Sequence, residues 1–259
     1  MARKSKSESR SIIKEELKSE VGDYNKNNNT NINKGKFAFT KAEMDKCGIE
    51  LTERQHELYK MIRNNTITTV QGAAGCAKTF VACYTALRML AEKKISKIVL
   101  TKLIQDAGNE VIGILPGNIT DKTDVYMNSY FSNIEKIIGK QNLAFLRAND
   151  MIAVAPIALM RGNTYDDSLM ILDEAQNCTM NQLILWATRI GKNSRCLIIG
   201  DGSQLDIKKR DSKFSDFIKM IDGVDGVSNF KFNKEDIVRS KILIDIVDRY
   251  EKYKDEHDM

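Results

Sequence analysis

The stretch Thr69–Thr79 (TVQGAAGCAKT) carries glycine, lysine and threonine at a spacing that can hold phosphate. It fits the pattern G-x-x-x-x-G-K-[ST] except at Ala77. In such a loop the backbone N–H groups and the start of the next helix hold the α- and β-phosphates of a nucleotide. We expect Lys78 to reach the β- and γ-phosphates and Thr79 to bind Mg²⁺. The predicted nucleotide-binding residues are Gly72, Ala73, Ala74, Gly75, Cys76, Ala77, Lys78 and Thr79.

Ala77 stands where the pattern asks for its second glycine. Glycine permits backbone torsions and a close approach that a Cβ atom hinders. Alanine is the smallest departure, so we expect an altered nucleotide affinity more than a loss of binding. The other interpretation of the stretch is an ordinary strand-turn-helix with a surface lysine.

Two adjacent carboxylates, Asp173 and Glu174, follow the apolar run Leu169–Leu172. Such a run predicts a buried parallel strand that emerges at its carboxyl end, where open α/β sheets bind ligands. We expect Asp173 to hold Mg²⁺, usually through water, and Glu174 to polarise the water that attacks the γ-phosphate. A solvated strand end would also explain the pair, but its position after a phosphate loop favours the catalytic interpretation.

Two glutamines are further candidates, and each has a second interpretation. Gln204 follows the apolar run that ends at Gly200-Asp201, and we predict that it senses the γ-phosphate; a polar turn is the alternative. Gln55 stands three residues after Thr52, which suits a capping box at a helix start. In helicase-like ATPases a glutamine at a comparable place reads the adenine base, so both interpretations of Gln55 stay open.

Strand and helix patterns alternate along the chain, which predicts an α/β fold with a parallel sheet covered by helices on both faces. We expect the 227–232 strand to lie at an edge. The predicted strands are 66–70, 97–101, 152–156, 169–172, 195–200 and 227–232, and the predicted helices are 52–62, 80–92, 124–139, 180–190, 212–221 and 236–253.

The first 36 residues differ in composition from the rest of the 259-residue chain. They are rich in Lys, Ser and Asn and hold few apolar side chains, so they cannot bury enough surface to offset their ordering entropy. We therefore predict a disordered basic tail over 1–36 and one ATPase domain over 37–259. The tail is either an electrostatic arm for nucleic acid or a solvated extension.

Cysteine usage and hydropathy indicate a cytoplasmic protein without a membrane segment. The five cysteines form no C-x-x-C pair and only two histidines are present, so neither a disulfide framework nor a zinc site is indicated. No apolar run has the length of a membrane span or of a signal peptide.

Taken in order, these motifs resemble the PhoH-like P-loop ATPases, a family with stand-alone members in bacteriophages. The resemblance runs from about Leu51 to Lys254. It rests on Gly72–Thr79, Ile98–Lys102, Ala107-Gly108, Leu115–Gly117, Ala155–Gly162, Ile171–Asn177, Thr188–Gly191, Gly200–Asp206 and Asp236–Arg239.

The resemblance implies a RecA-like core similar to half of a superfamily 1 helicase. It also implies hydrolysis of ATP with Mg²⁺, a homo-oligomeric ring that is expected to be a hexamer, and action on RNA or single-stranded DNA. A phage origin would place the protein in the host cytoplasm. A rival interpretation is a nucleotide-dependent nucleic-acid-binding switch without motor activity, but the presence of Glu174 favours hydrolysis.

Arg239 matches a family position near the end of the core, and we expect it to act as an arginine finger within its own or a neighbouring subunit. Arg161 and Arg189 are the other candidates, and a structural ion pair is the alternative for each of the three. The chain departs from the family pattern at Ala77, at Cys76 in place of threonine, and at Lys102-Leu103 in place of Arg-Pro, where a point charge replaces a planar fork.

Overall fold

The computed structural model describes residues 39–103, 119–201 and 213–238, with residues 242, 245, 246, 249 and 253. Of 119–126 and 234 it describes only the backbone. The chain divides into two units, residues 1–38 and Phe39–Met259, and every described residue belongs to the second. The predicted tail over 1–36 lies outside the described residues, so its disorder stays a prediction.

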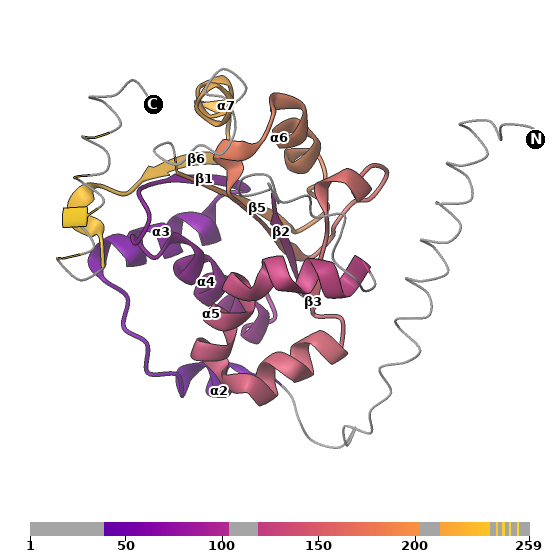
Figure 1. Cartoon of the computed structure of the whole chain (residues 1–259). Helices are drawn as coiled ribbons and strands as arrows, with labels where there is room; N and C mark the ends of the chain where they lie inside the picture. Colours follow the sequence, from indigo (N-terminus) through magenta and orange to yellow (C-terminus); the bar gives the residue numbers. More distant parts are fainter. Residues whose placement is uncertain are drawn as a thin grey trace, which may run out of the picture. The chain divides into compact units, whose positions relative to one another are not determined.

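A six-stranded sheet forms the centre of the fold, with the strand order β3-β2-β4-β5-β1-β6 (Figure 1). Every pair of neighbouring strands is parallel, which confirms the predicted α/β fold with a parallel sheet. The last strand lies at an edge, as its sequence predicts. The strands are β1 (Ile67–Gln71), β2 (Lys97–Lys102), β3 (Ile152–Val154), β4 (Ser168–Asp173), β5 (Arg195–Gly200) and β6 (Val227–Lys231).

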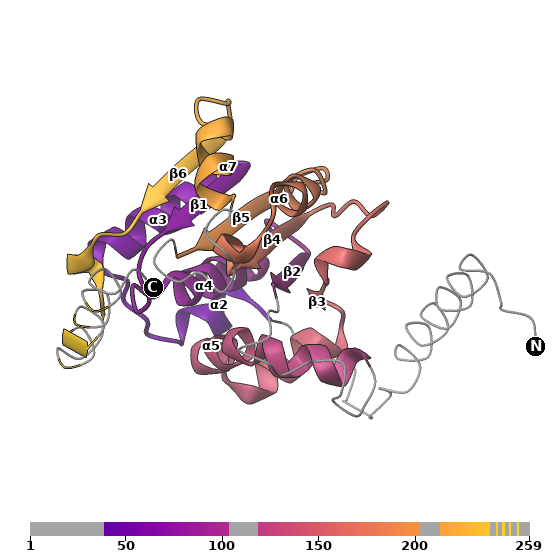
Figure 2. The same cartoon turned by 45° about the horizontal axis from the view of Figure 1, so that its top comes forward.

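Helices cover both faces of the sheet. Because successive strand residues point to opposite sides, one strand contributes side chains to two cores. In β5, Leu197 and Ile199 join a core with the side chains of α2, α3, α4 and α5. Cys196 and Ile198 instead join a second core, which contains Trp186 of α6 and side chains of α7. Figures 1 and 2 show these two helical layers on either side of the sheet. Trp186 is fully buried in this second core.

The described α-helices lie where the sequence predicts them, with one extension and one added helix. The predicted 124–139 helix is longer in the structure. Gly139 (φ 79°) interrupts the helical backbone, and the helix then continues and buries Leu143 and Leu146. The unpredicted α2 is a short helix that buries Met44. The helices are α2 (Lys41–Asp45), α3 (Glu53–Asn64), α4 (Lys78–Ala91), α5 (Ile119–Ala148), α6 (Met180–Ala187) and α7 (Phe214–Ile221), with 3-10 turns η2 (Ile157–Leu159), η3 (Ala175–Asn177) and η4 (Lys234–Asp236).

Most of the predicted 236–253 helix lies outside the described residues. All five cysteines are free in the structure. Within the described part of the chain, no helix combines the length and the apolar character that crossing a membrane requires.

Candidate nucleotide-binding site

The predicted phosphate loop lies where the fold requires a ligand site. It joins the carboxyl end of β1 to the start of α4, and β1 lies inside the sheet between β5 and β6. Parallel strands all end at the same edge, so β2, β4 and β5 bring Lys102, Asp173 and Asp201 to this side as well. The sequence separates these residues widely, and the strand order collects them.

The Lys78 ammonium is folded over the loop. Its Nζ donates to the carbonyl of Gly72 at 2.5 Å and to the carbonyl of Ala73 at 2.8 Å. The positive charge of Lys78 is therefore paired with neutral carbonyl oxygens of the phosphate loop. A phosphate oxygen carries formal negative charge and would be a stronger partner for the same ammonium.

Ala77 adopts the left-handed conformation, with φ 59° and ψ 26°, at the N-cap of α4. A residue with a Cβ atom pays roughly 1–2 kcal/mol for this conformation, whereas glycine adopts it freely. The loop thus keeps the backbone geometry that its missing glycine would favour. The strain at Ala77 therefore lowers the stability of the folded protein, while the loop backbone keeps its conformation.

We expect Ala77→Gly to raise the thermal unfolding midpoint by about 2–4 °C, because relief of this strain outweighs the extra entropy of glycine in the unfolded chain. Nucleotide affinity should stay equal or increase. Calorimetry and ATP titration measure the two effects, and Ala73→Gly in the same loop is the matched control. A folded Ala77→Gly protein that no longer binds ATP would contradict this account of the loop.

Thr79, at the start of α4, contacts the end of β4. Its Oγ1 donates to Oδ2 of Asp173 at 2.8 Å, and Oδ1 of the same carboxylate accepts from the backbone N–H of Glu174 at 3.0 Å. Burial and, after it, the neighbouring Glu174 charge raise the pKa of Asp173, while Thr79 and Lys102 oppose the rise. A hydroxyl and a buried carboxylate are thereby held against each other.

This pair of oxygen ligands fits Mg²⁺ in a nucleotide site. Mg²⁺ prefers a few protein oxygens together with phosphate and water to a cage built from protein alone. Among the residues that the structure describes, no three Asp, Glu, His or Cys side chains converge into such a cage. Thr79 and Asp173 would hold the ion, as their sequence positions predict.

We expect Asp173→Asn to keep or raise the stability of the nucleotide-free protein and to abolish the Mg²⁺-dependent gain in ATP affinity. Because the folded pKa of Asp173 is raised, wild-type stability falls as the pH rises through that pKa, and asparagine removes this loss. The stability difference should therefore be larger at pH 7 than below about pH 4. Thermal unfolding at both pH values, with and without ATP and Mg²⁺, measures it. If the Asp173→Asn protein, compared with wild type, is less stable at pH 7 than at acid pH, the predicted direction of the stability change is wrong.

Glu174 also has a left-handed backbone, with φ 59° and ψ 36°. Non-glycine residues in this conformation are concentrated at functional sites. Its Oε2 accepts from Nε2 of Gln176 at 2.7 Å, and its Oε1 lies 3.4 Å from Nζ of Lys102. Gln176 is buried, and its Oε1 accepts from the backbone N–H of Asp201 at 3.0 Å. The ends of β2 and β5 are thus both connected to Glu174.

The sequence motifs predict no role for Gln176, and they identify Lys102 only as a departure from the family pattern. The apolar run before Asp173 predicts that the carboxylates follow a buried strand, but it does not predict which strands lie beside that strand. A glutamine two residues after the acidic pair was the available signal for Gln176.

The segment Phe232–Val238, which we call the brace, packs against the phosphate loop and hydrogen-bonds to it. A Cβ atom at Gly72 would lie 2.8 Å from Cβ of Phe232, so glycine is needed there. The Cys76 thiol donates to the carbonyl of Asn233 at 3.9 Å, and the N–H of Val238 donates to the carbonyl of Gly75 at 3.0 Å. Burial raises the pKa of the Cys76 thiol, which keeps it protonated as a donor.

Gln55 is buried and forms the predicted capping box. Its Oε1 accepts from the N–H of Thr52 at 3.2 Å, and its own N–H donates to the Thr52 hydroxyl at 3.3 Å. The capping role is therefore confirmed, and adenine recognition by Gln55 stays a prediction.

The sequence proposes four further residues for the site, of which the structure describes two. Gln204 and Arg239 lie outside the described residues. Arg189 donates to the carbonyl of Asn163 and to the Thr188 hydroxyl, both at 3.3 Å, which favours its structural interpretation. Arg161 is exposed after η2.

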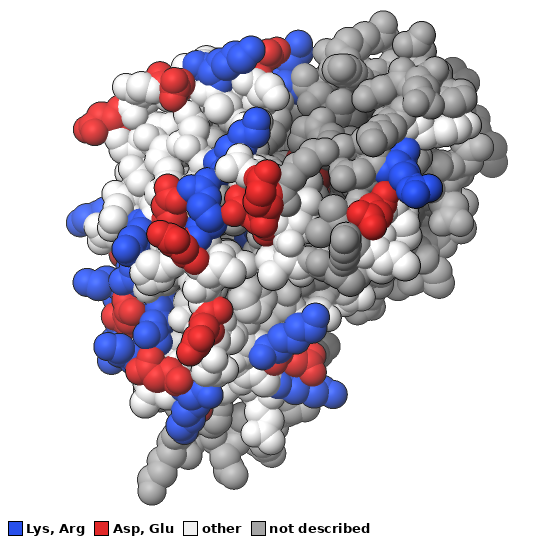
Figure 3. Space-filling model, turned by 90° about the vertical axis from the view of Figure 1, so that its left-hand side faces the viewer, with Lys and Arg blue, Asp and Glu red and all other residues white. Residues whose placement is uncertain are grey.

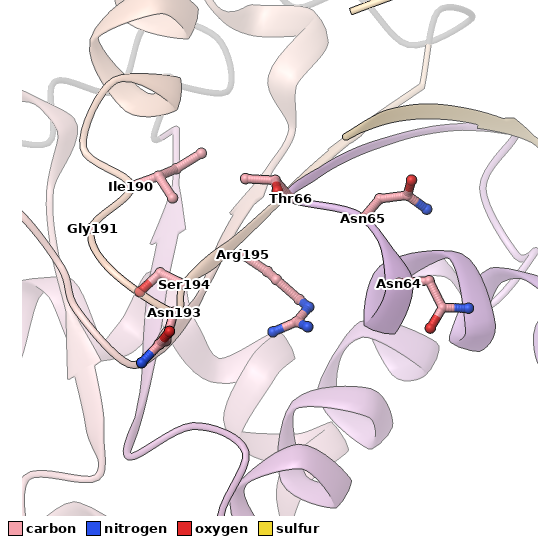
Figure 4. Close-up of a pocket in the computed structure, with 8 residues that line it drawn as sticks. All are labelled: Asn64, Asn65, Thr66, Ile190, Gly191, Asn193, Ser194 and Arg195. Atoms are coloured by element: carbon pink, nitrogen blue, oxygen red, sulfur yellow. The ribbon is translucent and has the colours of Figure 1, made fainter. Parts of the chain in front are cut away.

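A pocket of about 320 Å³ opens at the opposite edge of the sheet (Figure 4). It lies at the amino ends of β1 and β5, whereas the phosphate loop follows the carboxyl end of β1. It contains no carboxylate, so it lacks the groups that metal-assisted phosphate chemistry needs. Its lining is Asn64, Asn65, Thr66, Ile190, Gly191, Asn193, Ser194 and Arg195.

Charged side chains of both signs are mixed over the described surface on the side of the molecule shown in Figure 3. Oppositely charged side chains also pair at the surface, as Lys46 does with Glu43 at 2.6 Å. A mixed surface attracts nucleic-acid phosphates less than a surface of one positive sign.

Comparison with known proteins identifies relatives over most of the chain. The sequence model of the PhoH-like protein family matches residues 49–251. A PhoH-like protein of Bacillus subtilis is 35% identical over 202 residues, which cover 78% of this chain and 63% of that protein. Protein PhoH of Escherichia coli K12 is 31% identical over 193 residues, which cover 73% of this chain and 54% of that protein. The chain thus matches between about half and two thirds of the length of these curated relatives.

Two solved structures are similar at low sequence identity. The Hef helicase domain of Pyrococcus furiosus has a TM-score of 0.43 and 16% identity, over 71% of this chain and 38% of that one. The Pif1 helicase of Candida albicans has a TM-score of 0.40 and 14% identity, over 78% of this chain and 44% of that one.

Proposed function

Because the chain belongs to the PhoH-like protein family, we propose that it is a Mg²⁺-dependent ATPase that acts on or with RNA or single-stranded DNA. The observation that carries the proposal is the 2.8 Å hydrogen bond from Thr79 to Asp173. It places the helix that begins at the phosphate loop against the strand that ends in two carboxylates. The proposal therefore locates phosphate binding, metal binding and water activation at one edge of the sheet.

Each residue has a separate task in this proposal. Lys78 would leave the loop carbonyls and bind the β- and γ-phosphates, while Thr79 and Asp173 would hold the metal ion. Bound Mg²⁺ would supply positive charge to the phosphate oxygens. Glu174 orients a water and accepts its proton as that water attacks the γ-phosphorus, and the bond to the oxygen that bridges to the β-phosphate breaks.

The finer assignments belong to the same proposal. Gln204 would sense the γ-phosphate, and Arg239 would stabilise the charge of the transition state from its own or a neighbouring subunit. Gln55 would contact adenine in addition to capping α3. A hexameric ring, which the family resemblance implies, would place each nucleotide at a subunit boundary and so allow Arg239 to act on the neighbour.

Release of phosphate from ATP tests the proposal directly. We expect hydrolysis that requires Mg²⁺ and increases when oligo(U) or oligo(dT) is added. Hydrolysis that neither strand changes would remove the nucleic-acid part and leave the ATPase. Strand binding that depends on ATP, without phosphate release, would favour the alternative of a nucleotide-dependent switch.

Deletion of residues 1–36 should leave basal ATPase activity unchanged, because the tail lies outside every motif. It should weaken binding to oligo(U) and flatten its salt dependence, because each cation that neutralises a phosphate adds about 0.7 to the log–log slope for single strands. Fluorescence anisotropy at several salt concentrations measures the slope. An unchanged slope would assign the tail to a solvated extension.

A further inference from the structure

Lys102 is the last residue of β2, and its register partner on the neighbouring β4 is Asp173. Its Nζ lies 3.4 Å from Oε1 of Glu174, with the two side chains 25% and 33% exposed. Tight charge-assisted hydrogen bonds between such groups are about 2.7–2.9 Å long. The ammonium is therefore held loosely, at the edge of the sheet, by the carboxylate that we propose as the water activator.

Glu174 does not depend on Lys102 for its position. Its other oxygen accepts from Gln176 at 2.7 Å, and Gln176 is itself fixed by the N–H of Asp201 at 3.0 Å. Gln176 is 1% exposed, so this support is part of the core. If Lys102 moves to another anion, Glu174 keeps a hydrogen-bonded partner and gains a free oxygen.

Lys102 is also connected to the phosphate loop by a short series of contacts. Glu174 donates its backbone N–H to Asp173 at 3.0 Å, and the same carboxylate accepts from Thr79 at 2.8 Å. The Lys102 side chain therefore lies beside the groups proposed to receive the metal and the outer phosphates. Lysine suits an exchange of partners, because its flexible stem carries three donors that do not require a fixed fork geometry.

We infer that Lys102 is a sensor of the terminal phosphate: it pairs with Glu174 in the nucleotide-free protein and transfers to the γ-phosphate of a bound nucleoside triphosphate. The inference rests on the proposed function. A terminal phosphate carries more negative charge than a carboxylate, so it competes well for the ammonium. A nucleoside diphosphate ends at its β-phosphate and places no phosphate at the γ-position, so with it the pair between Lys102 and Glu174 persists. The transfer frees one oxygen of Glu174 for the attacking water only when a triphosphate is present.

Nucleotide binding at equilibrium tests the sensor without relying on turnover. Lys102→Met should weaken binding of the non-hydrolysable analogue AMP-PNP by about tenfold, since a hydrogen bond to a charged group is lost. ADP affinity should stay within about twofold, because ADP never engages Lys102. The matched control is Lys97→Met, which removes the same charge from the other end of β2 and should change neither affinity.

A second background separates the sensor from a general electrostatic effect. Glu174→Gln releases Lys102 from its partner, so Lys102→Met should weaken AMP-PNP binding more in that background than in wild type. Equal losses for AMP-PNP and ADP, or no loss for either, would overturn the sensor while leaving the ATPase proposal intact. A wild-type protein that binds neither nucleotide would overturn both. Thermal unfolding of each variant establishes that it is folded. Lys102→Arg keeps the positive charge and should retain part of the preference for AMP-PNP over ADP.

Discussion

Lys78→Ala is expected to weaken ATP binding by at least about 10²-fold and to remove hydrolysis. Each hydrogen bond to a charged group contributes about 1.5–3 kcal/mol, and Lys78 is proposed to make such bonds to two phosphates. In the nucleotide-free protein the same ammonium binds the carbonyls of Gly72 and Ala73. The ammonium exchanges these two loop contacts for phosphate contacts, so the measured affinity is the net gain from that exchange.

Isothermal titration with ATP and Mg²⁺ measures the Lys78→Ala effect. Lys60→Ala, which removes an exposed lysine on α3, is the matched control and should bind normally. Loss of the two loop contacts can also lower stability, so the unfolding midpoint is measured beside the affinity. A folded Lys78→Ala protein with ATP affinity within about threefold of wild type would remove Lys78 from the site.

Glu174→Gln should keep ATP binding and lower turnover by about 10² or more, because only the proton-accepting step is lost. The substitution preserves size, and the amide oxygen of the new side chain can still accept from Gln176. It also leaves Lys102 without its carboxylate partner, so ATP affinity should be equal to or tighter than that of wild type.

Single-turnover hydrolysis with saturating enzyme separates the chemical step from binding in Glu174→Gln. Glu57→Gln on the exposed face of α3 is the control for removal of one carboxylate. Parallel losses of affinity in Glu174→Gln and Lys78→Ala would show that the two residues do not divide binding and chemistry in the proposed way.

The parts of the site that the sequence predicts are those set by local chain geometry. The phosphate loop lies between β1 and α4, and Asp173 ends a strand whose residues are all buried. Thr52 and Gln55 form their capping box because its two partners are three residues apart. In each of these cases the contacts are made within one element or across one turn, so a short stretch contains the information.

The contacts that escaped prediction all depend on which strands are neighbours. Lys102 meets Glu174 because β2 lies beside β4, and Gln176 meets Asp201 because β5 lies on the other side of β4. The brace reaches Gly72 because β6 lies beside β1. The left-handed backbone of Ala77 was foreseeable from the missing glycine, whereas that of Glu174 had no sequence signal.

The position of the brace has a consequence for protein synthesis. Phe232–Val238 is made roughly 160 residues after the phosphate loop that it supports, which takes on the order of ten seconds at about 5–20 residues per second. Until then β1 has no β6 beside it, and Gly72, Gly75 and Cys76 lack their partners. If the proposed function holds, a chain still on the ribosome should therefore be unable to capture ATP until β6 and the brace have emerged.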